Sequence, residues 1–373
     1  MTAATTASPT IGGIHHLTAI SSDAQRTVDF YTTLLGLRLI KQTVNFDDPT
    51  SYHLYFADEE HGPGVLTFFE WRGAPRGNWG LGGTHHVAFE TRDRDTLLQW
   101  KRWLTDNGVS VTGPYDRVYF ESIYFTDPDG LILEIATRGP GWTVDERPDA
   151  LGSEVRLPPV STTIRHRDEA AIAATIWPEP IPRPTPAMRL KRMHHITAIG
   201  SDAGRTEAFF VERLGMRTVK RTVNFDNPTS PHLYFGAGDG APGTIITYFA
   251  YPRGTMRPFR LGSGMTHHFA LSVPDEETLL AWRDTLNENG VPTTDIRDRA
   301  YFQSIYLHDP DGLVIELATE TPGFRIDESS ADLGRALRLP PWLEQRRSEI
   351  EETLPPLHVP EPIGRKKREG AVR

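Results

Sequence analysis

The stretch that decides the fold is GIHHLTAI at residues 13–20, a doubled histidine at the head of an apolar run. The same pattern returns as GTHHVAFE at 83–90, RMHHITAI at 192–199 and MTHHFALSV at 265–273. The second and fourth copies are each followed by a glutamate, which lies 48 residues after the second histidine: Glu134 in LILEIAT and Glu316 in LVIELAT. Histidines and carboxylates that recur at one fixed spacing indicate a metal site.

The chain is a duplicated half. Residues 14–56 align without a gap with residues 193–235, and residues 117–137 align in the same way with residues 299–319. Each half divides again, because a strand headed by the doubled histidine leads into an amphipathic helix and then three further strands. The sequence therefore predicts an α+β fold made of four βαβββ modules.

The repeats also suggest domain limits. We expect a first half at 10–150 with modules one and two, and a second half at 189–325 with modules three and four. The proline-rich linker arm at 151–188 and the C-terminal arm and tail at 326–373 should pack on the outside.

Composition narrows the class of protein. The 373 residues include no cysteine, which excludes disulfides, zinc–thiolate sites and cysteine nucleophiles. The net charge of −9 argues against nucleic-acid binding, and no apolar run is long enough to span a membrane. The polar start MTAATTASPT is expected to be a frayed end, and the basic run at 365–368 a solvated tail. These features fit a cytoplasmic protein.

The type of metal follows from the number of ligands. Glu134 and Glu316 lie in otherwise apolar strands, and a buried carboxylate is costly unless it is paired or bound to a cation. In the first and third modules the matching position is not acidic, and Glu70 falls two residues out of register. Each site thus has two histidines and one carboxylate, an open face that suits non-haem Fe(II).

These residues carry a family resemblance over essentially the whole chain. Four modules with HH strand heads and a PDGxxxE strand resemble the vicinal oxygen chelate superfamily, which includes glyoxalases, bleomycin-resistance proteins and dioxygenases. The blocks HHITAI at 194–199, VNFDDPTSYHLYF at 44–56 and VRLPP at 155–159 resemble its ring-cleaving extradiol dioxygenases of the hydroquinone type. The resemblance implies that the modules form two open barrel-like sheets.

The resemblance also implies a ligand set. The metal would be held by His16, His268 and Glu316, with His15, His267, Arg299 and Tyr306 around it as catalytic residues. The second set is complete as well: ligands His195, His86 and Glu134, backed by His194, His85, Arg117 and Tyr124. The residues alone leave the pairing of modules open, because module one with two and three with four would use the same six ligands.

The expected function is an Fe(II)-dependent dioxygenase, with Mn(II) as a substitute metal, that opens the ring of a hydroquinone or catechol with O₂. A glyoxalase-type lyase or isomerase is the alternative enzyme, and a drug-binding resistance protein is the alternative without catalysis. A homo-oligomer is compatible with the sequence. The loop at 45–47 and its repeat at 224–226 are expected to be capped turns rather than pocket walls, and His53 and His232 ordinary strand residues.

Overall fold

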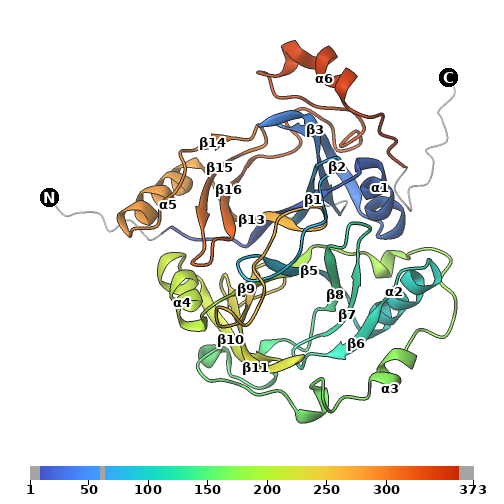
Figure 1. Cartoon of the computed structure of the whole chain (residues 1–373), viewed down its shortest axis with the longest axis vertical. Coiled ribbons are helices and arrows are strands. Elements are labelled where there is room, and N and C mark those ends of the chain that lie inside the picture. The colour runs from blue at the N-terminus through green and yellow to red at the C-terminus, as the bar shows by residue number, and fades with distance from the viewer. Residues whose placement is uncertain (1–8, 59–63, 361–373) are drawn as a thin grey trace.

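The computed structural model describes residues 9–58 and 64–360, and it consists of two curled, open half-barrel sheets with few helices (Figure 1). The α+β class and the four βαβββ modules predicted from the sequence are confirmed. The basic run at 365–368 lies outside the described residues. In the part of the chain that is described, no helix is long and apolar enough to cross a membrane.

The first sheet has eight strands in the order β14-β15-β16-β13-β1-β4-β3-β2. Its strands are β1 (Ile14–Ser21), β2 (Arg38–Asn45), β3 (Asp48–Ala57), β4 (Val65–Glu70), β13 (Thr266–Val273), β14 (Arg297–Asp298), β15 (Phe302–His308) and β16 (Val314–Pro322). It combines the first module with the fourth, which are the two ends of the chain. The pairing implied by the resemblance is therefore the one that forms.

The second sheet combines the middle two modules in the order β10-β11-β12-β9-β5-β8-β7-β6. Its strands are β5 (Thr84–Thr91), β6 (Thr112–Asp116), β7 (Glu121–Thr126), β8 (Ile132–Thr137), β9 (Met193–Gly200), β10 (Arg217–Asn224), β11 (Asn227–Gly236) and β12 (Ile245–Ala250). Each sheet thus takes one module from each half of the sequence, so the halves at 10–150 and 189–325 interleave.

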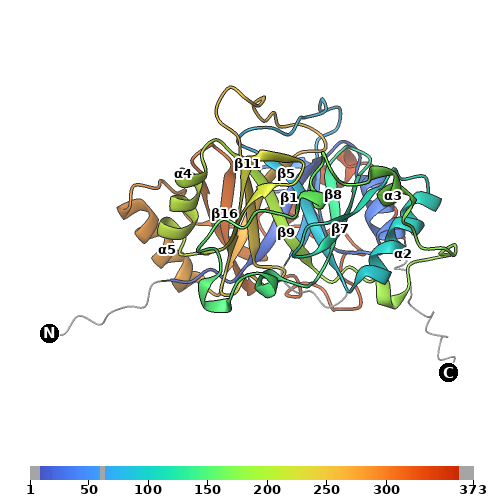
Figure 2. The ribbon, with the colours of Figure 1, turned by 90° about the horizontal axis from the view of Figure 1, so that it is seen from below.

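One helix per module covers the outer face of its sheet. These are α1 (Ala24–Asp29), which continues as η1 (Phe30–Leu34), α2 (Arg94–Asp106), α4 (Ala203–Ala208), which continues as η6 (Phe209–Arg213), and α5 (Glu276–Glu288). Each begins at an aspartate whose carboxylate accepts a backbone N–H from the first turn: Asp23, Asp93, Asp202 and Asp275. Seen from below, the strands run through the middle while α4 and α5 lie on one side and α2 and α3 on the other (Figure 2).

Two aspartates of the predicted DPDG turns join the two sheets. Asp129 accepts the backbone N–H of Ser22 at 2.9 Å, and Asp311 accepts that of Ser201 at 2.6 Å. Each carboxylate also pairs with an arginine, Arg26 at 2.8 Å for Asp129 and Arg205 at 2.9 Å for Asp311. Because each turn belongs to one sheet and its serine to the other, these contacts fix the sheets relative to each other.

The arms that follow each half cover the edge strands. The end of the first half contains η2 (Trp142–Val144) and η3 (Pro148–Ala150), and the linker arm contains η4 (Val160–Thr162), α3 (Glu169–Ala174) and η5 (Pro186–Met188). The C-terminal arm contains η7 (Glu344–Arg346) and α6 (Arg347–Thr353). Lys41 of β2 is fully buried and pairs with Asp327 and Glu328 of the C-terminal arm, while Lys220 of β10 pairs likewise with Asp145 and Glu146. An unpaired edge is a site of aggregation, so these arms protect β2 and β10.

Candidate metal centres

Strand register brings the first set of predicted ligands together. Glu316 of β16 lies opposite Ala270 of β13, and Ala270 in turn lies opposite His16 of β1. His268 is two residues before Ala270, so its side chain leaves the same face of β13. Ligands from residues 16, 268 and 316 therefore share one patch of the sheet only because β1 pairs with β13.

The donor atoms of this first triad nearly touch. The Nε2 atoms of His16 and His268 are 3.2 Å apart, and Oε2 of Glu316 lies 3.2 Å from His16 and 2.9 Å from His268. Three donors that bind one ion at about 2.1 Å and at right angles would lie about 3 Å apart. All three residues are buried, and they form one of two groups with metal-binding geometry in the described part of the chain.

The second triad repeats this arrangement in the other sheet. Ala88 of β5 lies opposite both Glu134 and His195, which places these two ligands in one row. The Nε2 atoms of His86 and His195 are 3.3 Å apart, and Oε2 of Glu134 lies 2.8 Å from His86 and 3.3 Å from His195. The two triads are therefore equal in composition and geometry.

Both glutamates need a cation. The side chains of Glu134 and Glu316 are 0% exposed, and within the described residues the polar groups near their oxygens are the Nε2 atoms of the two histidines of each triad. Burial opposes ionisation of Glu316, yet His16 and His268 outweigh it and hold the carboxyl pKa well below its usual range. A buried, ionised carboxylate is costly unless it is paired or bound to a cation, so the triads fit a bound metal ion.

The doubled histidine has a structural reason. In all four pairs the two Nδ1 atoms lie within hydrogen-bond distance: 2.8 Å in His15–His16, 2.7 Å in His85–His86, and 2.8 Å in His194–His195 and His267–His268. A histidine that binds metal through Nε2 carries its proton on Nδ1, and an outer acceptor fixes that tautomer. The first histidine of each pair is that acceptor.

These acceptor histidines are held neutral. Burial, and after it the adjacent His16, lowers the pKa of His15 to about 3. The pKa values of His85 and His194 are likewise lowered to about 3, and that of His267 to about 4. A neutral imidazole that accepts through Nδ1 presents an Nε2–H on its other side. In His15 this N–H donates to the backbone of Thr319.

Tyr306 and Arg299 lie beside the first triad, as the sequence predicts. Tyr306 of β15 pairs with Glu316 in the ladder, and its ring meets the His268 ring edge-on at 5.7 Å. Arg299 donates from Nε to the Tyr306 hydroxyl at 3.2 Å and pairs with Asp47 at 3.1 Å. Burial, and after it Glu316, raises the pKa of Tyr306, so the phenol stays protonated and able to donate.

The loop aspartates are more than turn residues. The predicted capped turn is present, since the backbone N–H of Asp47 donates to the Asn45 side chain at 3.0 Å. Asp47 nevertheless also holds Arg299, and Asp226 holds the equivalent Arg117 at 3.0 Å. The prediction that this loop stays out of the pocket is therefore wrong for the second triad, where Asp226 lines the cavity.

One residue near the second triad was not predicted from the sequence. Arg167 of the linker arm pairs with Asp226 and lies over the Tyr115 ring, 4.2 Å from its centroid. Asp226 is thus bound by two arginines, whereas the side chain of Asp47 is 76% exposed and pairs with Arg299 alone among the described residues. The cavity at the second triad has a volume of about 30 Å³.

Other histidines and carboxylates have structural roles. His53 donates or accepts at 2.9 Å with Thr67, whose hydroxyl donates to Thr18 at 2.8 Å beside His268, so His53 supports the wall of the site. Glu70 accepts the backbone N–H of Ala24 at 3.0 Å, at the start of α1. The indole rings of Trp71 and Trp79 lie at the rim, 6.1 Å from the His267 ring and 5.1 Å from the His85 ring respectively.

Fold and sites together define a class of metal-binding proteins built from paired βαβββ modules. The sequence model of the Glyoxalase/Bleomycin resistance protein/Dioxygenase superfamily matches residues 13–135 and 192–317. The chain belongs to this superfamily. The sequence-based recognition of the family is confirmed.

Within the superfamily the chain is similar to named dioxygenases. It shares 31% identity over 348 residues with "Putative ring-cleaving dioxygenase MhqA" of Bacillus subtilis, which covers 93% of this chain and 99% of that protein. It shares 26% identity with "Chlorohydroquinone/hydroquinone 1,2-dioxygenase" of Sphingobium indicum, over 92% and 96% of the two chains. A crystal structure titled as a putative dioxygenase from Bacillus subtilis superposes with a TM-score of 0.75 at 30% identity, over 95% and 100% of the chains. Glyoxalase I of Zea mays shares the fold, with a TM-score of 0.55 at 16% identity over 83% and 92% of the chains.

Proposed function

We propose that the protein is a non-haem Fe(II) dioxygenase that opens the ring of a hydroquinone-type aromatic diol. The observation that carries the proposal is the triad of His16, His268 and Glu316, whose three donor atoms converge and whose buried carboxylate has no Lys or Arg partner among the described residues. Two neutral imidazoles and one carboxylate suit Fe(II), and Mn(II) is a substitute with similar ligand preferences. The similarity to relatives named as ring-cleaving and hydroquinone dioxygenases supports the same activity.

The bound iron would supply the site where the diol and O₂ meet and exchange electrons. The residues of this chain then have three tasks. Arg299 places a positive charge beside the substrate oxygen and favours its phenolate form. Tyr306 stays protonated and donates a hydrogen bond to the oxygen on which negative charge develops. His15 and His267 hold the tautomers of the ligands, and His267 offers an N–H group to a ring substituent.

The second set has the same types of residue around its triad. Arg117, Tyr124, His85 and His194 surround the triad of His86, His195 and Glu134 in the corresponding positions. The Arg117 guanidinium lies 5.3 Å from the centroid of the Tyr124 ring, close to the 5.4 Å of the Arg299–Tyr306 pair. Both triads are therefore proposed as metal sites.

Oxygen uptake tests the proposal most directly. The protein is loaded anaerobically with Fe(II) and then mixed with aerated hydroquinones and catechols. We expect one O₂ consumed per ring opened and both atoms of labelled O₂ in the product, and Glu316→Gln should abolish most of this uptake. Turnover that persists without O₂, or an unlabelled product, would contradict the dioxygenase and favour a glyoxalase-type lyase.

A further inference from the structure

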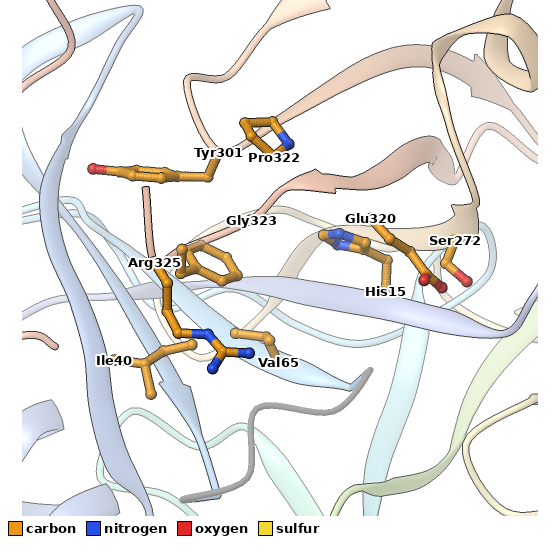
Figure 3. A pocket seen from close by; sticks show the side chains of 10 residues that line it. His15, Ile40, Val65, Ser272, Tyr301, Glu320, Pro322, Gly323 and Arg325 are labelled. Atoms are coloured by element: carbon orange, nitrogen blue, oxygen red, sulfur yellow. The ribbon is translucent and has the colours of Figure 1, made fainter. Parts of the chain in front are cut away.

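A cavity of about 260 Å³ adjoins the first triad on the side of His15 (Figure 3). We name it the His15 cavity, and its lining residues are His15, Ile40, Val65, Ser272, Tyr301, Glu320, Pro322, Gly323, Phe324 and Arg325. His15 joins the cavity to the metal ligands, because its Nδ1 lies 2.8 Å from that of His16. The Phe302 ring lies against both histidines, with centroids 5.0 Å and 5.3 Å away.

Internal duplication provides a built-in comparison, because each wall of this cavity has a counterpart in the other sheet. Phe324 packs on Tyr301 at 5.4 Å and on Tyr55 at 5.1 Å between ring centroids. Its counterpart Trp142 makes the same two contacts, at 5.2 Å with Tyr119 and 4.9 Å with Tyr234. The two aromatic residues thus occupy the same place, but the indole is larger.

The larger ring closes the second copy. Trp142 donates from Nε1 to the carbonyl of Gly240 at 2.7 Å, and the residue is only 8% exposed. A phenylalanine has no N–H, so Phe324 cannot make the equivalent bond. Phe324 therefore leaves space in the first sheet, whereas Trp142 fills the equivalent space in the second sheet.

A second pair of substitutions acts in the same direction. Ser272 N–H donates to the carbonyl of Gly13, and Glu90 N–H donates to that of Arg192, at 2.8 Å and 2.9 Å, so these pairs are equivalent. In the second sheet the side chains of Arg192 and Glu90 form an ion pair at 3.6 Å. In the first sheet Gly13 and Ser272 occupy the equivalent positions, and Ser272 lines the cavity.

The lining indicates the class of ligand. Phe324, Ile40 and Val65 offer apolar surface to a ring, while Ser272 and Glu320 offer hydrogen bonds at one end. Arg325 crosses the space between Ile40 and Val65 (Figure 3), and it has no ion-pair partner within residues 9–58 and 64–360. A guanidinium in this position recognises an anionic group such as a carboxylate.

The volume of the His15 cavity fits one aromatic ring. An apolar cavity of about 150 Å³ holds benzene, whereas a water molecule occupies about 30 Å³ of liquid. The His15 cavity, at about 260 Å³, therefore has room for a substituted ring.

We propose that the His15 cavity is a binding site, confined to the first sheet, for a single-ring phenol or hydroquinone that carries an anionic substituent. Phe324 and Arg325 would be its specificity-determining residues, and Trp142 with the Arg192–Glu90 pair would exclude the same ligand from the second sheet. The ring would then lie beside His15 in the first sheet, and the equivalent place in the second sheet would stay closed to it. The identity of the ring rests on the proposed function, whereas the presence of the site does not.

Calorimetric titration of the metal-free, full-length protein tests the site without any turnover. The probes are 2,5-dihydroxybenzoate, which is a carboxylated hydroquinone, and unsubstituted hydroquinone. We expect one dihydroxybenzoate per chain, bound about tenfold more tightly than hydroquinone, because charge-assisted pairing with Arg325 is lost in the latter. Arg325→Gln should remove this preference and leave hydroquinone binding unchanged.

Exchanging the aromatic residues provides a matched pair of variants. Phe324→Trp should weaken the binding of both ligands at least about tenfold, because the larger ring fills the cavity. Trp142→Phe should leave the affinity of the first-sheet site unchanged. Unaltered binding in Phe324→Trp, two equivalents of ligand in the wild type, or no preference for the carboxylate would overturn the proposal. If Phe324→Trp does not fold, Arg325→Gln decides alone. Binding without ring opening of any diol would refute the proposed function and leave the site standing.

Discussion

The Nδ1 atoms of His15 and His16 lie 2.8 Å apart, so the outer histidine orients the inner one. The same contact recurs at the other three histidine pairs. Outer hydrogen-bond acceptors of this kind usually change metal affinity by about 10–100-fold when they are removed. We therefore expect four of these eight histidines to bind metal and the other four to support them.

The first prediction follows from this contact. His267→Ala should weaken metal binding at the first triad by about 10–100-fold, because His268 loses the acceptor that fixes its tautomer. His267→Gln keeps an acceptor oxygen and should retain more of the affinity. Competition with a colorimetric chelator measures both constants, and equal affinities of His267→Ala and the wild type would show that the contact is incidental.

The second prediction concerns stoichiometry. Because the two triads have the same residues and nearly the same distances, anaerobic reconstitution should give two equivalents of iron per chain. Glu134→Gln and Glu316→Gln should each retain one equivalent, and the double variant none. A value of one in the wild type that Glu134→Gln leaves unchanged would show that the second set does not bind metal.

The third prediction concerns Arg167. In the Glu316→Gln background only the second triad should hold metal, and Arg167 pairs with Asp226, which lines the cavity at this triad. Arg167→Ala should speed removal of this metal by a chelator severalfold, since the linker arm then no longer pairs with Asp226. Arg165→Ala removes an exposed arginine two residues away and is the matched control. Equal removal rates in both variants would contradict this role of Arg167.

The fourth prediction is a dependence of stability on pH in the metal-free protein. Burial lowers the pKa of His15, His85 and His194 from 6.5 to about 3. Between these pH values the unfolded chain binds protons that the folded chain does not, so stability falls as pH falls from about 6.5. Each histidine contributes a slope of up to about 1.4 kcal/mol per pH unit.

Thermal unfolding at pH 8 to 4 measures this effect. The triple variant His15→Gln, His85→Gln and His194→Gln should show a flatter profile, because glutamine does not titrate. A profile as steep as that of the wild type would assign the pH dependence to other groups.

Sequence reasoning predicted the ligands because strand alternation and two repeats constrain them. Glu316 and Glu134 stand out as carboxylates in apolar strands, and Glu70 is excluded by register. The module pairing could not be derived in this way, since either pairing satisfies the same six ligands. It depends on which strands meet across the sheet, here β1 with β13 and β5 with β9.

The differences between the two sites could not be predicted from the sequence, for another reason. Phe324 and Trp142 stand at equivalent positions of the two repeats. The difference between the two ring sizes matters only where a cavity adjoins the ring. Arg167 lies in a segment predicted to be an outer arm, and nothing in its neighbours indicates Asp226 as its partner. Contacts between segments of distant sequence decide both features.

The last prediction separates chemistry from metal binding at Tyr306. Its hydroxyl is not a ligand, but it receives a hydrogen bond from Arg299 at 3.2 Å and lies one strand away from Glu316. Tyr306→Phe keeps the ring that packs on His268 and removes only the donor, so iron affinity should change less than about threefold. Removal of one donor to a developing oxyanion usually costs about 10²–10³ in turnover. Oxygen uptake by the Glu134→Gln protein, with and without Tyr306→Phe, isolates the first triad, and Tyr124→Phe in the same background is the control in the other sheet. Loss of iron in proportion to activity would show that Tyr306 supports the metal site and not the reaction.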